Sequence, residues 1–380
     1  MTEVFAGAEN IISSLGFTSD ENIGNIIRGK SGIVLDDSGM YSPSILPLSK
    51  VDHDRLESIR PLSADITRME RMFIASILDA GKRADIDLSS PETLFILTTT
   101  KGNIDLLDPV LQAKFGKNRI YLHSMAKVIT TYFNNPNKAI IVSNACISGV
   151  LGIIYGERLI RAGKYKHIVV SGGDLMSEFI VSGFQSFQSL SEQACKPFDR
   201  DRTGLTLGEG AASIILSSSQ GIFKETPVKV LGGAGSNDGN HISGPSRTGE
   251  GLLVAIQQAM KLSGLTPEDI DTISAHGTAT DYNDEMEAKA FSRASLEEVP
   301  LNSYKAYIGH TLGAAGVIEA AISLQSMKRN MLFRSAGYDH HGVSKSIHVI
   351  KENIEKEVST CLKTGSGFGG SNAAVILQKI

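Results

Sequence analysis

Short apolar runs alternate with stretches of helical periodicity through the first half of the chain. The runs at 94–98, 139–143 and 167–171 are rich in Leu, Ile and Val, which predicts buried strands. Residues 148–162 place apolar side chains at the three- and four-residue spacing of an amphipathic helix. This strand–helix–strand order favours an α/β fold with many parallel strand pairs.

The second half of the chain repeats this theme. Apolar spacing typical of helices occurs at 249–263, 284–294 and 313–327. The Thr-Pro-Glu-Asp sequence at 266–269 predicts a short helical turn. Further strands are expected at 211–216, 228–231, 270–275 and 373–378.

A polar, reactive residue follows a strand in each half, Cys146 in the first and His276 in the second. The matching positions indicate an internal duplication, although the two halves share little sequence. We therefore expect two closely packed halves, 1–225 and 226–380, rather than separate domains joined by a linker.

Composition and charge limit the classes of function. The 380 residues carry a net charge of −4 without a basic tract, so nothing indicates nucleic-acid binding. The most apolar stretch, 140–156, contains polar and small residues and falls short of a membrane span. The first twelve residues include Glu3 and Glu9 and no positive charge, unlike a secretory signal. Three widely spaced cysteines form no zinc-ligand pattern, so we expect a cytoplasmic protein without a bound metal.

Cys146 follows one predicted strand and opens the helix predicted at 148–162. The small residues around it, in the sequence SNACISG at 143–149, allow a sharp turn and the close approach of a substrate. The positive end of a helix dipole favours a thiolate. On this segment alone, a buried core cysteine is an equally good interpretation.

Two histidines lie in glycine-rich segments after predicted strands, His276 in AHGTAT and His310 in KAYIGHTLGAAG. Although a lone histidine is more often structural, two imidazoles can donate hydrogen bonds to a carbonyl oxygen that becomes negative. They can also exchange protons near neutral pH. The run GSGFGGSN at 365–372 can direct backbone N–H groups into a site, but an ordinary turn or a phosphate cradle would also fit.

Together these segments resemble the elongating β-ketoacyl-[acyl carrier protein] synthases, which are Cys-His-His condensing enzymes. The similarity covers most of the chain and is strongest in blocks that follow the family's order: 144–149, 196–204 with 207–210, 276–284, 305–319 and 367–372. The resemblance implies a duplicated, layered αβαβα fold of the thiolase-like type. It also implies a homodimer, with a heterodimer as the alternative.

The resemblance implies a role for each matched residue of the catalytic set. Cys146 would be the acylated nucleophile, and His276 and His310 would promote decarboxylation and stabilise the enolate. Lys305, five residues before His310, matches the family's lysine, and Glu319, nine residues after it, matches a buried supporting carboxylate.

Further matches concern the substrate and its carrier. Phe368, which follows Gly367, matches a phenylalanine that gates the acyl pocket, and its N–H would form an oxyanion hole with that of Cys146. Thr278 and Thr280 match residues that hold the phosphopantetheine arm. The acyl carrier protein supplies this arm, so no separate cofactor is implied. Acidic carriers need a local basic patch, and positions like those of the family are occupied by Arg68, Arg119 and Arg202.

The implied reaction is a decarboxylative Claisen condensation. Cys146 would take the growing acyl chain from its carrier, and loss of carbon dioxide from malonyl carrier would give an enolate. Attack of the enolate on the Cys146 thioester would release a β-ketoacyl carrier, so that covalent catalysis divides one difficult transfer into two. The product would belong to fatty-acid, polyketide or polyene-type synthesis.

Some segments depart from the family pattern. FAGAENII at 5–12 lacks a Thr-Gly-Met-Gly-like turn, and TTTKGN at 98–103 replaces a Gly-x-Gly run. Ile147 stands where alanine is usual, and Ser366 stands where a second phenylalanine precedes the gate. These changes leave the catalytic set intact and indicate a specialised acyl substrate.

Two other classes of protein stay open. A non-catalytic partner subunit, such as a chain-length factor, would lack the nucleophile that this chain has. Thiolases need a second cysteine near the C-terminus, but Cys361 precedes Leu-Lys rather than glycine and is interpreted as a core residue. Initiating synthases, which use coenzyme A, pair their cysteine with one histidine and an asparagine, whereas His310 fills the second place here. Cys195 receives no role.

Overall fold

The computed structural model describes residues 2–59, 63–239, 241 and 244–380, and its main feature is a mixed sheet of ten strands. The N-terminal half of this sheet contains, in spatial order, β1 (Phe5–Ile12), β8 (Gly210–Ser217), β6 (His167–Asp174), β4 (Thr93–Thr98) and β5 (Ile140–Val142). The C-terminal half contains β9 (Val228–Asn237), β15 (Ser371–Lys379), β14 (Thr360–Gly367), β10 (Thr272–Ser274) and β11 (Leu301–Asn302).

Both halves of the sheet have the same pairing pattern. In each, the first three strands are antiparallel neighbours and the last two are added in parallel. The halves are joined where β1 pairs with β9 over only two residue pairs. This repetition is the duplication that the sequence indicated, and the expected division at residue 225 lies between η3 (Gln220–Ile222) and β9.

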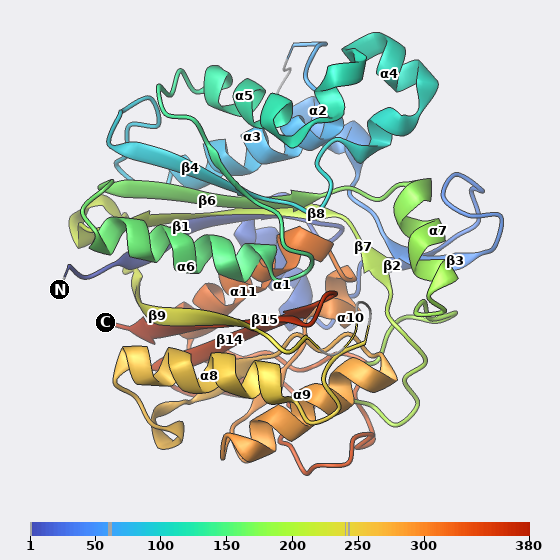
Figure 1. The fold of residues 1–380 in the computed structure, drawn as a ribbon, viewed down its shortest axis with the longest axis vertical. Helices are drawn as coiled ribbons and strands as arrows, with labels where there is room; N and C mark the ends of the chain where they lie inside the picture. The colour runs from blue at the N-terminus through green and yellow to red at the C-terminus, as the bar shows by residue number, and fades with distance from the viewer. Residues whose placement is uncertain (1, 60–62, 240, 242–243) are drawn as a thin grey trace.

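Helices cover both outer faces of the sheet and fill the space between its halves (Figure 1). The central layer contains α6 (Ser148–Arg161) and α11 (Ala315–Arg329). The N-terminal half is covered by α3 (Arg68–Gly81) and α5 (Leu122–Tyr132), and the C-terminal half by α8 (Glu250–Ser263) and α9 (Asp281–Arg293). Every residue of α11 from Ala315 to Met327 is buried, as expected for a helix packed between the two halves of the sheet. The predicted αβαβα layering is confirmed.

Shorter elements complete the fold. The remaining helices are α1 (Ser19–Ile27), α2 (His53–Ile59), α4 (Pro109–Phe115), α7 (Glu178–Ser186) and α10 (Lys305–Ile308). The remaining strands are β2 (Ile33–Asp36), β3 (Leu46–Ser49), β7 (Leu207–Gly208), β12 (Met331–Leu332) and β13 (Ile354–Glu355). Among the described residues, none of the helices combines the length and the apolar surface needed to cross a bilayer.

The predicted elements are present, with some changes in their limits. The strand expected at 228–231 continues to Asn237 through a glycine-rich segment. Glycine is required there because a Cβ atom on Gly233 would lie 2.6 Å from Cγ1 of Ile154, which packs from α6. The helix expected at 313–327 is preceded by a 3-10 turn and begins at Ala315.

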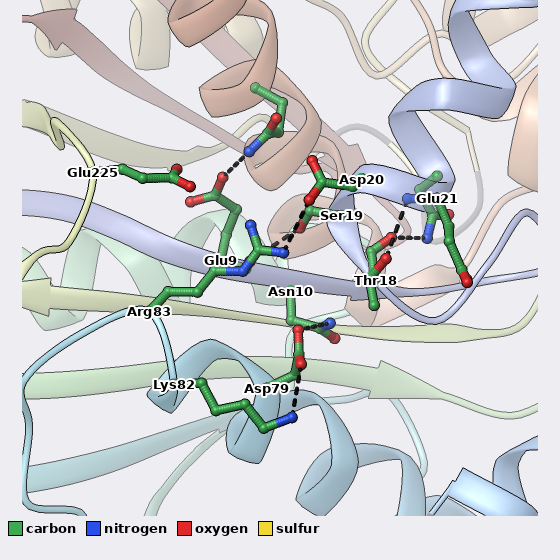
Figure 2. A network of polar contacts seen from close by, with 12 residues as sticks. Glu9, Asn10, Thr18, Ser19, Asp20, Glu21, Asp79, Lys82, Arg83 and Glu225 are labelled. Atoms are coloured by element: carbon green, nitrogen blue, oxygen red, sulfur yellow. Dashed lines mark hydrogen bonds and ion pairs between the residues drawn. The ribbon is translucent and has the colours of Figure 1, made fainter.

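The N-terminal strand carries two fully buried polar residues, Glu9 and Asn10, in the segment that departs from the family pattern. Their side chains point to opposite faces of β1 (Figure 2). Glu9 forms an ion pair with Lys328 of α11 at 3.0 Å. Asn10 Nδ2 donates to Asp79 of α3 at 2.8 Å. Polar contacts therefore tie this strand to the central helix on one side and to an outer helix on the other.

Candidate active site

Cys146 lies in a tight turn between β5 and α6. Ala145 adopts a left-handed conformation with φ of 44°, which reverses the chain just before the thiol. Ser148 closes the turn, because its hydroxyl accepts from the Asn144 N–H at 2.8 Å and donates to the Ala145 carbonyl at 2.7 Å. The predicted strand–turn–helix setting of the cysteine is confirmed.

His310 lies directly against the thiol, with Nε2 at 3.1 Å from Cys146 Sγ. Backbone contacts fix its position: its N–H donates to the Thr206 carbonyl at 2.7 Å, and its carbonyl accepts from the Gly208 N–H at 3.1 Å. The ring of His276 stands edge-on to that of His310, with centroids 5.1 Å apart. The fold thus brings together the predicted nucleophile and both predicted histidines.

A pocket of about 460 Å³ opens at Cys146. Its lining is mainly aromatic and aliphatic, with Phe179, Ile180, Phe184, Phe187, Leu312 and Phe368. Phe368 stacks on Phe184 at a centroid distance of 5.7 Å and meets Phe187 edge-on at 5.4 Å. An apolar cavity beside a nucleophile suits an acyl chain. A groove of about 890 Å³ beside α5 is larger, but it shares no lining residue with this pocket.

Lys305 lies behind His276 and fixes the tautomer of its ring. The fully buried ammonium contacts Glu319 Oε1 at 2.6 Å, His276 Nδ1 at 3.3 Å and the His276 carbonyl. Because an ammonium group can only donate, Nδ1 must be the acceptor, so the ring proton lies on Nε2. His276 therefore presents an N–H donor on the side away from Lys305.

Three buried charged residues complete this environment, and sequence reasoning gave none of them a role. Lys363 Nζ lies 2.6 Å from Glu319 Oε2. Glu287 accepts from the N–H groups of His276 at 2.8 Å and Gly277 at 2.6 Å. Asp284 accepts from the Thr278 N–H at 3.0 Å. Their burial depends on partners from other segments of the chain, so the sequence pattern alone gave no signal for them.

Asp174, at the end of β6, explains the TTTKGN segment at 98–103. Thr99 and Thr100 each donate a hydroxyl to Asp174 Oδ1 at 2.9 Å, and the Gly313 N–H donates to Oδ2 at 2.7 Å. Burial raises the pKa of Asp174, and the Thr100 N–H opposes that rise. This carboxylate links the loop beside the nucleophile to the turn that follows His310, which the sequence did not reveal.

Burial determines the protonation states of the reactive groups. It raises the pKa of Cys146 to about 11, while the positive charges of Lys305 and Lys101 oppose the rise. The thiolate expected from the helix dipole is therefore not the resting form, because loss of hydration outweighs the favourable field. Burial, followed by the charge of Lys305, lowers the pKa of His276 and of His310 well below the ordinary value. Both imidazoles are neutral near pH 7, and His310 can accept the thiol proton.

The same three side chains have the donor types of a zinc site. Ligand atoms of Cys146, His276 and His310 lie within 4.8 Å of one another. The surroundings oppose a cation, however, because Lys305 donates to His276 Nδ1 and Lys363 adds a second ammonium behind it. The arrangement suits proton transfer and the stabilisation of an anion better than the binding of a metal ion.

The residues predicted to bind substrate lie around this centre. Gly367 passes close to the nucleophile, since a Cβ atom there would lie 3.0 Å from the backbone nitrogen of Cys146. Thr278 is buried and Thr280 half-buried, and their hydroxyls are 2.8 Å apart on the loop that follows His276. These positions agree with an oxyanion hole and a phosphopantetheine channel, and both roles stay predictions.

The three arginines predicted to dock the carrier are held by contacts within the chain. Arg119 binds both carboxylate oxygens of buried Glu70 at 2.6 and 2.7 Å. Arg68 lies 3.3 Å from buried Glu209. The side chain of Arg202 is only 8% exposed and donates to two backbone carbonyl groups. These contacts give each arginine a structural role, and docking stays a prediction.

Comparison with known proteins places the chain in a family. The β-ketoacyl synthase N-terminal domain matches residues 65–221, and the β-ketoacyl synthase C-terminal domain matches residues 228–339. The 3-oxoacyl-[acyl-carrier-protein] synthase 2 of Rhizobium meliloti is 33% identical over 64% of this chain and 61% of its own. The polyketide biosynthesis malonyl-ACP decarboxylase of Bacillus subtilis is 30% identical over 67% of this chain and 63% of its own. The chain thus spans about three fifths of the length of these relatives.

A solved structure, described as a ketosynthase in complex with its chain length factor from Xenorhabdus doucetiae, shares the whole fold. It has a TM-score of 0.88 and 25% sequence identity, and the match covers 100% of this chain and 98% of that one. The two domain matches together cover more than half of the chain and include the cysteine, both histidines, Lys305 and Glu319. The chain therefore belongs to the β-ketoacyl synthase family.

Proposed function

We propose that the protein is a condensing acyltransferase, which joins an acyl chain held on Cys146 to malonyl units delivered by an acyl carrier protein. The observation that carries this proposal is the 3.1 Å contact between Cys146 Sγ and His310 Nε2, with His276 beside it. The contact lies at the mouth of an apolar pocket of about 460 Å³. A nucleophile, a base, a second imidazole and an acyl-sized cavity are the parts that this chemistry needs.

The first half-reaction transfers the acyl chain. Neutral His310 accepts the Cys146 proton at Nε2 as sulfur attacks the thioester carbonyl of the acyl carrier. The tetrahedral oxyanion receives N–H donors from Cys146 and Phe368, and its collapse breaks the bond to the phosphopantetheine sulfur. His310 returns the proton to that leaving sulfur, so no net proton is taken up.

The second half-reaction consumes malonyl carrier and one proton. His276 donates from Nε2 to the malonyl thioester oxygen, and the carbon–carbon bond to the carboxylate breaks to give carbon dioxide and an enolate. Once Cys146 is acylated, Nε2 of His310 no longer accepts the thiol hydrogen, so the neutral ring can adopt the tautomer with its proton on Nε2 and donate that N–H to the same oxygen. The enolate carbon attacks the Cys146 thioester, a β-ketoacyl carrier forms, and the released sulfur is reprotonated.

Two alternatives are less well supported by the geometry. One relative is described as a malonyl-ACP decarboxylase, which would need the histidines but no acyl acceptor. A chain-length-factor-type subunit would need neither the two histidines nor an acyl acceptor. Both leave unexplained why Cys146 contacts His310 and opens into an apolar pocket.

A dimeric assembly is part of the proposal. β5 (Ile140–Val142) ends the ten-stranded sheet, and its three residues are half-buried, which leaves a sheet edge for pairing with another chain. The solved ketosynthase mentioned above is paired with a chain length factor, so the second chain is either a copy of this protein or a related subunit. Size-exclusion chromatography with light scattering, with and without candidate subunits, distinguishes these assemblies.

The test of the function follows both half-reactions in one sample. The protein is incubated with acyl carrier proteins of several chain lengths, mapped by mass spectrometry, and then given malonyl carrier. We expect acylation of Cys146, followed by carbon dioxide and a β-ketoacyl carrier. Cys146→Ala should lose acylation and condensation, whereas Cys195→Ala, at a buried cysteine outside the pocket, should keep both. Acyl label on Cys195 or Cys361, or carbon dioxide without condensation, would overturn the proposal.

A further inference from the structure

Glu319 lies between two lysines. Lys305 Nζ is 2.6 Å from Oε1, and Lys363 Nζ is 2.6 Å from Oε2. Both lysine side chains are fully buried, and the glutamate side chain is 2% exposed. The contact of Lys363 with Oε2 is an ion pair whose geometry falls outside that of a directed hydrogen bond. A second buried ammonium is costly to desolvate, so its presence here needs a cause beyond pairing with Glu319.

Lys363 also holds the backbone that leads to the first histidine. β14 pairs in parallel with β10 so that Lys363 lies opposite Ser274, two residues before His276. Its ammonium donates to the Ser274 carbonyl at 3.1 Å and to the Ala275 carbonyl at 3.3 Å. Lys363 therefore touches the strand end that positions His276 and the carboxylate that positions Lys305.

The charged groups around Lys363 come from several elements. Lys305 lies on α10, Glu319 on α11 and Glu287 on α9, and His276 lies in the loop after β10. Burial lowers the pKa of Lys363, whereas Glu319 raises it. The positive charge of Lys363 also contributes to the low pKa of both histidines, after burial and Lys305. Its removal should therefore make His310 easier to protonate.

We propose that Lys363 is a second positioning residue, which anchors the end of β10 and clamps Glu319 so that Lys305 orients His276 for decarboxylation. This inference rests on the proposed function and deepens it. The carbonyl contacts fix the backbone of His276, and the Glu319 contact fixes the acceptor that holds Lys305. His276 then aims its Nε2 proton at the enolate oxygen without further reorganisation.

Two variants separate the parts of this role. Lys363→Met removes both the charge and the donors, and Lys363→Gln keeps donors without the charge. Lys328→Met is the matched control, because Lys328 also pairs with a buried glutamate, Glu9, and touches no member of the site. Circular dichroism and urea unfolding establish that each variant is folded.

The readouts are single-turnover release of carbon dioxide from malonyl carrier and, separately, acylation of Cys146 at several pH values. Outer residues that orient a reacting group typically contribute roughly 10- to 100-fold to activity. We expect decarboxylation to fall by that factor in Lys363→Met and less in Lys363→Gln, with acylation at pH 8 within threefold of wild type. The acid limb of the acylation profile, which is the fall in rate at low pH, should move to higher pH in both variants. His310 must be neutral to accept the thiol proton, and loss of the Lys363 charge makes it easier to protonate. This shift reports the charge of Lys363, and the loss of decarboxylation with acylation preserved reports its positioning role.

The outcomes are distinguishable. If the wild-type protein releases no carbon dioxide from malonyl carrier, the proposed function fails. If it does, and both Lys363 variants decarboxylate within threefold of wild type, only the role of Lys363 is overturned. Equal losses of acylation and decarboxylation in a folded variant, without movement of the acid limb, would likewise overturn the positioning role.

Discussion

Helix α11 carries one member of each of two ion clusters, and the clusters differ in what they contact. Near its start, Glu319 lies between Lys305 and Lys363, and all three side chains are shielded from solvent. Nine residues later, about 13 Å along the helix axis, Lys328 lies between Glu9 and Glu225. Glu225 points toward Glu9 and is 55% exposed (Figure 2).

The first cluster directs its donors at a histidine of the candidate active site, and the second does not. Lys305 contacts His276 Nδ1, and Lys363 contacts the backbone just before His276. Among the described residues, the ammonium group of Lys328 contacts the carboxylates of Glu9 and Glu225, which connect α11 to β1 and to the segment that precedes β9. A lysine that pairs with a buried carboxylate is therefore not by itself evidence of a site. The contacts of the lysine decide whether its burial serves chemistry or stability.

The largest effect is expected at Glu319. Glu319→Gln would leave Lys305 and Lys363 buried without the carboxylate between them. Breaking a buried pair by removing one partner costs about 3–5 kcal/mol of unfolding free energy. Decarboxylation should fall by roughly 100-fold or more, because Lys305 loses the acceptor that orients it. Urea unfolding and single-turnover release of carbon dioxide measure the two effects.

Glu9→Gln supplies the contrast for this variant. Glu9 is as deeply buried, so its loss should also reduce the free energy of unfolding, but the folded protein should decarboxylate at the wild-type rate. If both variants impair chemistry equally, or neither does, the functional distinction between the clusters is wrong.

His310→Ala tests the proposed role of His310 as a hydrogen-bond donor in decarboxylation and as a base in acylation. Loss of one donor to a developing oxyanion typically costs about 10²–10³ in rate, so malonyl decarboxylation should fall by that factor. Acylation should become dependent on the thiolate, because the base is missing. Since the pKa of Cys146 is about 11, the acylation rate should rise about tenfold for each pH unit between 7 and 9. His276→Ala keeps the base and should show a shallower dependence; a flat profile for His310→Ala would contradict the role of His310.

The sequence was sufficient for the fold and for the residues that the fold brings together at the candidate site. Periodicity located the strands that end near Cys146 and His276, and ordered motifs supplied His310, Lys305 and Glu319. Cys146, His276 and His310 are recognisable because small residues beside them let the chain turn or a substrate approach, whereas Lys305 and Glu319 were matched by their spacing from His310.

The supporting charges could not be assigned from the sequence. A lone lysine in a strand, such as Lys363, is normally interpreted as an exposed edge residue, and only its partner on α11 makes burial possible. The burial of Glu287 also depends on another segment, because the N–H groups that donate hydrogen bonds to its carboxylate belong to His276 and Gly277. The sequence also indicated that a helix dipole would favour the Cys146 thiolate, because the dipole can be inferred from the pattern and the loss of hydration cannot.

A smaller effect is expected from Lys328→Met. Glu9 would lose its cation but keep a hydrogen bond from Gln325, so the cost should be about 1–3 kcal/mol, the range for a buried polar group left incompletely satisfied. Acylation and decarboxylation by the folded protein should match wild type. Thermal unfolding and both kinetic assays check this. A kinetic loss without a stability loss would mean that the second cluster is coupled to the site.

The smallest effect is expected at Glu225, the exposed member of the second cluster. Its ion pair with Lys328 has a distance of 3.1 Å, and an exposed pair contributes only about 0.2–1 kcal/mol. Partial burial raises the pKa of Glu225, but Lys328 and nearby arginines lower it by more, so that the net direction is below the ordinary value of 4.5. A carboxyl with a lowered folded-state pKa stabilises the protein above that ordinary value, and this contribution is lost as the pH falls through the folded pKa.

Glu225→Gln should therefore lower the free energy of unfolding slightly at pH 7, and the difference from wild type should disappear in acid below the folded-state pKa of Glu225. It should also shrink at about 1 M salt, where the screening length is about 3 Å. Glu9 is fully buried, so its pair with Lys328 should resist added salt. Urea unfolding of wild type, Glu225→Gln and Glu9→Gln at two salt concentrations makes the comparison. An equal salt response for the two variants would show that Glu9 and Glu225 belong to one solvent-accessible network, and the contrast between a closed and an open cluster would fail.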